Sequence, residues 1–296
     1  MSSLTRISAV ELFDSAWSRP TRWSRLRRVA AKNPLGVVGL SLVAFVLAVA
    51  IVGPFFAPSP TKISSDILKG VSSSHWFGTD NLGRDYFARV VSGARLSLFL
   101  SVTAMLIGAT AGVTLGMLSG YLGGLFDLLV QRVIDVLLAF PGLILLLLLG
   151  QVMGRGWQSV AVGLGFLNAV GLTRLMRAYT LSIRAQPYIE AEHVVGATTF
   201  RILTRHVFPN MAPALFVFIT VLIGGAILAE GALAFLGLGV APPAPSWGRM
   251  LAEGRSQITQ PHLAIFPGLA MTITVLGFSL LGDSLRDILD PRLRNR

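Results

Sequence analysis

Long apolar segments constrain this chain more than any other feature of its sequence. They occupy residues 34–57, 96–120, 128–150, 158–178, 212–240 and 263–284. Each is close to the ~20 residues that a helix needs to cross the hydrocarbon core of a bilayer. The composition agrees, because 53% of the 296 residues are hydrophobic and only 13% are charged, against about 25% charged in soluble proteins. We expect an all-α, polytopic membrane protein with six transmembrane helices.

The charge distribution predicts how these helices are oriented. The net charge is +11, from 25 Lys and Arg against 14 Asp and Glu, but the basic residues gather beside the apolar runs. This pattern indicates membrane topology rather than a nucleic-acid partner. The run at 34–57 is too long for the 7–15-residue core of a signal peptide, so we interpret it as an uncleaved first span. Both termini are then expected in the cytoplasm.

This topology divides the chain into segments. Residues 1–33 form a basic cytoplasmic segment, and residues 34–296 form the transmembrane domain. Within that domain we expect an outer loop at 58–95 and a cytoplasmic loop at 179–211. We see no internal repeat.

The cytoplasmic loop contains a polar stretch, EAEHVVGATTFRILTRHVFPN, at residues 190–210. Pro187 is well suited to the first turn of a helix, and Glu190 is favoured near a helix N-terminus by the dipole. Gly196 is unfavourable in a helix interior and predicts a bend. Pro209 predicts the end of the segment and can itself open the next span. We expect two short helices joined at Gly196. From the pattern alone, a linker lying at the membrane surface is an alternative.

The same stretch resembles the EAA loop of ABC-importer permeases, through Glu190-Ala191, Gly196 and Pro209. Three further stretches resemble the C-type inner-membrane subunit of dipeptide, oligopeptide and nickel importers: HWFGTDNLGRDYFARVVSGARLSL (75–98), GALAFLGLGVAPPAPSWGRML (231–251) and FSLLGDSLRDILDPRL (278–293). Two positions depart from the family pattern. Glu192 replaces a small residue, and His262 stands where an aromatic residue is expected.

The resemblance implies a type I ABC importer permease in the bacterial inner membrane that imports dipeptides or oligopeptides. Its ATPase-coupling residues would be Glu190, Ala191, Gly196, Arg201 and Pro209. Implied partners are a second, homologous permease subunit, two cytoplasmic ATPase subunits or domains, an extracytoplasmic solute-binding protein and membrane lipid. Nickel or another small solute is the alternative cargo, and an ion-coupled secondary transporter is the alternative class.

The chain itself offers little for catalysis. A phosphate-binding P-loop needs Gly-Lys-Ser/Thr, but the lysines here are followed by Asn, Ile and Gly. ATP and Mg²⁺ are therefore expected on the partner ATPases, with no cofactor in this chain. Cysteine is absent, and the four histidines lack paired metal spacing, so we predict no metal site and no catalytic residue.

A few charged and small residues inside the spans invite interpretation. Glu230 lies within an apolar run, where a carboxylate should face protein or water, so it is a candidate for the translocation path; a structural role is the alternative. Arg132 and Asp135 are three residues apart and are predicted to pair, and Pro141 beyond them is predicted to kink the helix. Glycines recur every fourth residue and predict a tight helix contact: Gly108, Gly112, Gly116, Gly120 and Gly124.

Overall fold

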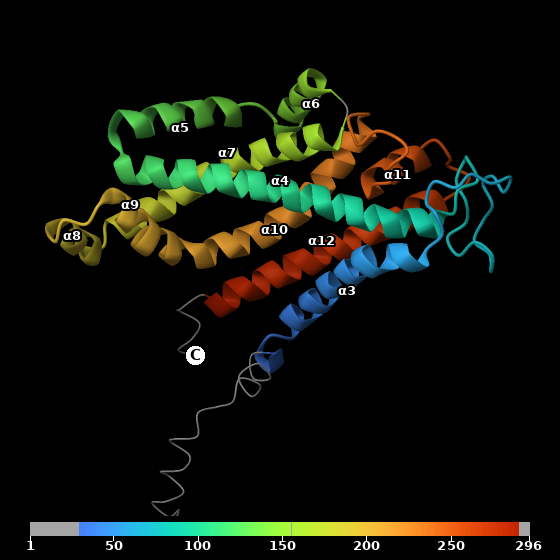
Figure 1. The fold of residues 1–296 in the computed structure, drawn as a ribbon, viewed down its shortest axis with the longest axis horizontal. Coiled ribbons are helices and arrows are strands. Elements are labelled where there is room, and N and C mark those ends of the chain that lie inside the picture. Colours follow the sequence, from blue (N-terminus) through green and yellow to red (C-terminus); the bar gives the residue numbers. More distant parts are fainter. Residues whose placement is uncertain (1–29, 155, 290–296) are drawn as a thin grey trace, which may run out of the picture.

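A computed structural model describes residues 30–154 and 156–289, which fold into helices and connecting loops (Figure 1). The elements are α3 (Pro34–Phe56), α4 (Tyr86–Leu122), α5 (Gly124–Leu138), α6 (Gly142–Met153), α7 (Trp157–Arg184), α8 (Pro187–Val194), α9 (Thr199–Ile202), the π-helical turn η1 (Leu203–Val207), α10 (Phe208–Phe235), α11 (Trp247–Gly254) and α12 (His262–Leu289). Together they form an elongated bundle. Most of the basic N-terminal segment lies outside the described residues.

Five helical stretches within the described part of the chain are long and apolar enough to cross a membrane. They are α3, α4, α7, the continuous stretch Thr199–Phe235, and α12. A sixth crossing is made by α5 and α6 together, which are bent by 94° at the break between them. The break contains Pro141, so the kink predicted there is confirmed.

Helices α4 and α7 are the most extensively packed pair. A Cβ added at Gly108 would lie 2.6 Å from Asn168 Cβ, at Gly112 2.7 Å from Leu172 Cβ, and at Gly120 2.9 Å from Thr180 Cβ. The glycines therefore let the two helices approach closely, as the spacing predicted. Gly124 does not belong to this seam. It begins α5 with φ 60° and has nothing within 4 Å of an added Cβ, because the chain turns away at Gly123.

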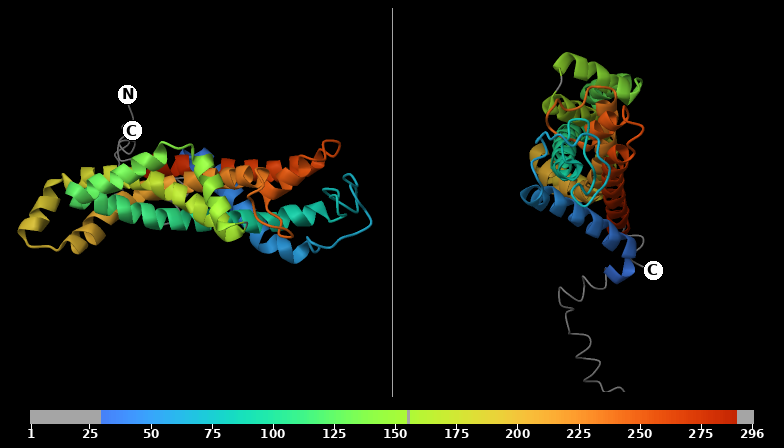
Figure 2. Two further views of the ribbon diagram at one scale, coloured as in Figure 1. Left: turned by 90° about the horizontal axis from the view of Figure 1, so that it is seen from above. Right: turned by 90° about the vertical axis from the view of Figure 1, so that its right-hand side faces the viewer.

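The contacts also fix the directions of the helices. Residue numbers rise together along the α4–α7 seam, so these helices are parallel and the bent α5–α6 pair carries the chain back between them. Helices α3 and α12 are antiparallel, since Gly36 lies against Ser284 and Gly39 against Leu281. Pro34 and Leu289 therefore lie at the same end of the bundle. Figure 2 shows the bundle from two further directions.

Several helix boundaries differ from the predicted ones. Helix α4 begins at Tyr86, so the outer segment ends at Asp85 rather than at residue 95. Helix α7 runs on to Arg184, α8 occupies Pro187–Val194, and the helical stretch that continues into α10 begins at Thr199, so the predicted 179–211 loop is largely helical. The added turns contain polar residues that lower their hydropathy: Arg89 and Thr180 are buried, whereas Arg201 and Arg205 are exposed.

Candidate functional site

The polar stretch after α7 folds as a helical hairpin, which we call the 187–207 element. Helix α8 ends near Val195, and Gly196 adopts φ 80°, a left-handed conformation that glycine enters at little cost. The backbone then turns into α9, whose N-terminus is capped by the Thr198 hydroxyl accepting from the Arg201 N–H at 3.3 Å. The two short helices joined at Gly196 are therefore confirmed.

Aliphatic side chains anchor this element to the bundle. Ile189 of α8, Ile202 of α9 and Val207 of η1 are at most 1% exposed. They pack in one hydrophobic cluster with Met176 of α7 and Met211 of α10. Burying such side chains stabilises the packed arrangement by about 1.5–3 kcal/mol each. The element is therefore seated on α7 and α10.

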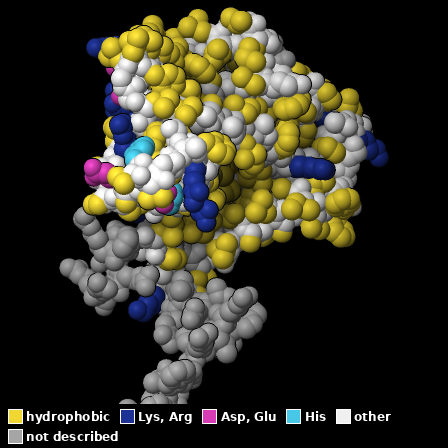
Figure 3. Space-filling model, turned by 60° about the vertical axis from the view of Figure 1, so that its left-hand side comes forward, with side chains coloured by type: hydrophobic (Ala, Val, Ile, Leu, Met, Phe, Trp, Pro, Cys, Tyr) yellow, Lys and Arg dark blue, Asp and Glu magenta, His cyan; other side chains and the backbone are white. Residues whose placement is uncertain are grey.

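The opposite face of the element presents apolar side chains outward. Val194 and Val195 are each 85% exposed and Phe200 is 77% exposed. The sequence-predicted coupling residues are exposed around them: Glu190, Ala191, Gly196, Arg201 and Pro209. Figure 3 shows that the acidic and histidine side chains in view lie toward its left side, with Lys and Arg at both sides and hydrophobic side chains over much of the rest.

Two polar contacts tie the element to its neighbours. The hydroxyl of Tyr121, at the end of α4, lies 3.0 Å from Nε2 of His193. The Nε2 of His206 in η1 lies 3.2 Å from a carboxylate oxygen of Glu192 in α8. Glu192, which departs from the family pattern, therefore joins the two arms of the hairpin.

Pro209 lies in the first turn of α10, so it opens the next span as the sequence predicts, but it does not interrupt the helix before it. The stretch Thr199–Phe235 is helical throughout, and the π-helical turn η1 precedes Pro209. Proline removes one backbone donor, and a wider π turn is one way in which a helix accommodates an irregular hydrogen-bond pattern. Helix α10 therefore continues the arm that begins at α9.

Glu230 is enclosed by protein in this structure. Its side chain is 0% exposed, and its Oε1 accepts a hydrogen bond of 2.7 Å from the Ser246 hydroxyl, the N-cap of α11. A Cβ added at Gly248 would lie 2.9 Å from Glu230 Oε2. The carboxylate thus faces the first turn of α11, where a helix dipole favours negative charge. The structure gives Glu230 partners within the protein, and its place in the translocation path stays a prediction.

The predicted pair of Arg132 with Asp135 is wrong. Asp135 instead accepts a 2.7 Å hydrogen bond from Arg174 of α7. The spacing of three residues would allow a pair within α5, but the fold places α5 beside α7, so a long side chain from the neighbouring helix reaches the carboxylate. Asp127 of α5 pairs with Arg177 of α7 in the same way, at 2.5 Å.

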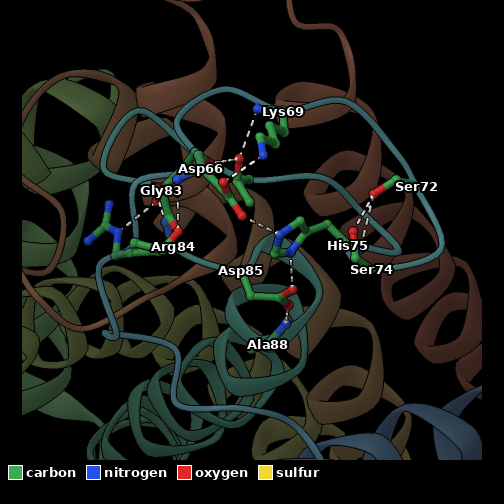
Figure 4. Close-up of polar contacts among 12 residues, drawn as sticks. Asp66, Lys69, Ser72, Ser74, His75, Gly83, Arg84, Asp85 and Ala88 are labelled. Carbon is green, nitrogen blue, oxygen red and sulfur yellow. Dashed lines mark hydrogen bonds and ion pairs between the residues drawn. The ribbon is translucent and has the colours of Figure 1, made fainter.

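At the other end of the bundle, residues 57–85 form an ordered loop held by polar contacts (Figure 4). His75 lies between two carboxylates, 3.2 Å from Asp85 and 3.4 Å from Asp66. The hydrogen bond to Asp85 is the main cause that raises the pKa of His75 above its ordinary value. The contact with Lys69 is the main cause that lowers the pKa of Asp66. Asp85 also caps α4 by accepting from Ala88 N–H.

Behind this loop lies a network that we call the ionic junction, formed by Asp80, Arg84, Arg89, Arg249 and Glu253. Arg89 is 0% exposed, and its guanidinium donates to Glu253 of α11 at 2.7 Å and faces Asp80 at 3.2 Å. Arg249 donates to the other Glu253 oxygen at 2.7 Å, and Arg84 to Asp80 at 2.6 Å.

The sequence analysis did not predict the ionic junction. Arg249 and Glu253 are four residues apart, a spacing that allows pairing on a helix, and this was the available signal. Their connection to Arg89 joins positions 164 residues apart, which no local pattern can reveal.

Comparison with known proteins shows the family. The sequence pattern described as "Binding-protein-dependent transport system inner membrane component" matches residues 112–295. The chain belongs to this family. Residues 21–69 of the permease also match the "N-terminal TM domain of oligopeptide transport permease C".

Curated relatives extend the likeness over nearly the whole permease. It is 39% identical over 279 residues to the glutathione transport system permease protein GsiD of Pectobacterium atrosepticum, covering 93% of each chain. It is 40% identical over 278 residues to the proteins of that name from Escherichia coli O6:K15:H31 and Shigella boydii, covering 93% of this chain and 92% of each relative. The chain is therefore an ABC-importer permease of the peptide and oligopeptide transport family, in the inner membrane.

Proposed function

We propose that this permease forms one half of the path by which an ATP-driven importer moves small peptides across the membrane. The 187–207 element is the surface on which an ATPase subunit docks. A second, homologous permease subunit supplies the other half of the path, and a solute-binding protein delivers cargo on the opposite side. The ATPases hold ATP and Mg²⁺, and no covalent step occurs in this chain.

The docking proposal rests on the exposed apolar side chains of Val194, Val195 and Phe200, which we call the apolar tip. The helical stretch that leaves the tip has 37 residues and is about 55 Å long at 1.5 Å per residue. The hydrocarbon core is only ~30 Å thick, so this stretch is long enough to extend past the core. An apolar surface that extends into water marks an interaction site. Since the ATPases are cytoplasmic, this end and both termini lie on the cytoplasmic side.

The peptide proposal is supported by the relatives. Glutathione, which the relatives' names give as their transported compound, is itself a small peptide, and residues 21–69 match an oligopeptide permease region. The ATPases drive transport by contacting the 187–207 element differently in their nucleotide-bound and nucleotide-free states, since only a difference in binding shifts a conformational equilibrium.

Val195→Asp tests the docking surface. The charge would have to be buried against the ATPase, so we expect the ATPase subunits to be lost when the permease is purified from cells that express the whole system. Val71→Asp is the matched control, because Val71 is 60% exposed in the loop at the opposite end. Retention of the ATPases by Val195→Asp, or equal loss from both variants, would remove the assignment of this surface.

Cargo and energy source are tested in proteoliposomes containing the whole complex. We expect ATP-dependent uptake of glutathione or of a labelled dipeptide, and no uptake when an ion gradient replaces ATP. Uptake of nickel alone would contradict the peptide proposal. Accumulation by the permease without ATPases would contradict the importer mechanism altogether.

A further inference from the structure

Helix α4 is held at both ends by elements that lie far apart. Its 37 residues correspond to about 55 Å. At one end Tyr121 contacts His193 of the 187–207 element. At the other end Arg89 of α4 donates to Glu253 of α11. The two contacts place α4 between the proposed ATPase-docking surface and α11.

Helix α11 is fastened to α4 near both of its ends. At its N-terminus, Trp247 N–H donates to the Ser97 hydroxyl at 3.0 Å, and the Trp247 indole donates to the Val90 carbonyl at 2.9 Å. At its C-terminus, Glu253 accepts from Arg89 and Arg249. Arg249 therefore secures the carboxylate that connects the two helices.

Helix α10 also runs between the two ends, but its construction differs. It follows the π turn η1, contains Pro213 within the helix, and has adjacent glycines at positions 224 and 225. Such features are the usual sites of helix bending. Helix α4 has no proline and is backed by α7 along the glycine seam. Of these two helices, α4 is the stiffer connection.

We propose that α4 is the rod that carries movement of the 187–207 element to α11, and that Tyr121, Arg249 and Glu253 are positioning residues that fasten its two ends. The inference rests on the proposed function, because an ATPase supplies the movement. It assigns α11 as the element that changes position on the side opposite the ATPases.

Spin labelling tests this inference directly, because the chain has no cysteine to remove. Ile258, four residues beyond α11 and 89% exposed, is replaced by cysteine and labelled in the complete complex with its ATPases. In the otherwise unaltered permease, we expect the accessibility of the label to a water-soluble relaxation agent to change when ATP and vanadate trap the ATPases together. An unchanged label would overturn the inference.

Two pairs of variants separate transmission from simple stability. Arg249→Gln removes one contact of the ionic junction, whereas Arg255→Gln makes the same change just beyond α11, where the guanidinium lies over the Phe235 ring. Tyr121→Phe removes the hydroxyl facing His193, and Tyr179→Phe removes a hydroxyl of α7 outside that contact.

We expect the nucleotide-dependent change at residue 258 to fall about fivefold in Arg249→Gln and Tyr121→Phe, the effect of losing about 1 kcal/mol of coupling. Basal ATP hydrolysis should persist in all four variants, and both control variants should keep the full change. Equal responses within each pair would overturn the inference while the proposed function stands. Failure of the unaltered permease to bind ATPases would instead remove the proposed function.

Discussion

The two ends of α4 are secured by different kinds of contact. Near Tyr86 the helix enters the ionic junction, where Arg89 is completely buried and charged groups contact one another directly. Near Tyr121 the helix contacts the 187–207 element through one hydroxyl–imidazole pair and aliphatic packing, and it contacts α5 and α7 through the Ser119–Asp127 hydrogen bond and the Arg184 guanidinium over the Tyr121 ring. A dense ionic network holds one geometry, whereas the sparse contacts leave the 187–207 element free to meet another protein. The difference indicates which end of α4 is joined firmly to another element of the same subunit and which end is presented to a partner.

Removing a charge from the ionic junction should have the largest effect on stability. Arg89→Met leaves the buried carboxylate of Asp80 and the partly exposed carboxylate of Glu253 with fewer partners, which costs about 3–5 kcal/mol. Arg174→Met, which breaks the exposed pair with Asp135, should cost about 0–1 kcal/mol. The unfolding midpoint in detergent measures both. Equal shifts of the unfolding midpoint would contradict the difference between the buried ionic junction and an exposed ion pair.

The glycine seam should give the next largest effect. A methyl group added by Gly116→Ala would lie 2.5 Å from the Thr173 carbonyl oxygen, and overpacking of this kind costs about 1–3 kcal/mol. The methyl group added by Gly171→Ala on α7 would have nothing within 4 Å. The better helix propensity of alanine should therefore stabilise the folded permease by up to about 1 kcal/mol. The unfolding midpoint should fall for Gly116→Ala and rise for Gly171→Ala. Shifts in the same direction would contradict the close approach of α4 and α7.

The smallest effect should be the pH dependence of the 57–85 loop. The pKa of His75 is raised in the folded loop, chiefly by Asp85. Its stabilisation is therefore fully present below the unfolded pKa of about 6.5 and is lost as the pH rises through the folded value. Hydrogen-exchange protection factors of this loop should fall as the pH rises above about 6.5.

His75→Gln should remove this dependence. His262→Gln should preserve it, because the His262 ring faces the Thr79 carbonyl. If hydrogen-exchange protection of this loop instead rose with pH in the unaltered permease, protonated His75 would not be the group that stabilises the loop.

The membrane architecture could be predicted because apolar length is a local property. The spans, the kink at Pro141 and the bend at Gly196 all follow from residues that act on their immediate neighbourhood. Four of the five glycines were placed on the correct face for the same reason. Gly124 was not, since α4 ends at Leu122 and the chain turns at Gly123.

The rest depended on contacts between distant segments. Arg132 was a plausible partner for Asp135 until the fold brought Arg174 beside it. The start of α4 at Tyr86 could not be predicted from hydropathy. Arg89 lowers the mean hydropathy of this segment, although its side chain is buried beside compensating charges. Whether Glu230 meets cargo in another state stays a prediction; in this structure its carboxylate contacts α11.

The parallel arrangement of α4 and α7 also affects how the permease is made. Residues 165–180, which fill the glycine face of α4, emerge from the ribosome only after α5 and α6 have been synthesised. Until then, the glycine face of residues 108–120 has no partner within the nascent chain. The bent α5–α6 segment therefore governs the order of assembly, and slower insertion of that segment would lengthen the time that α4 waits unpaired.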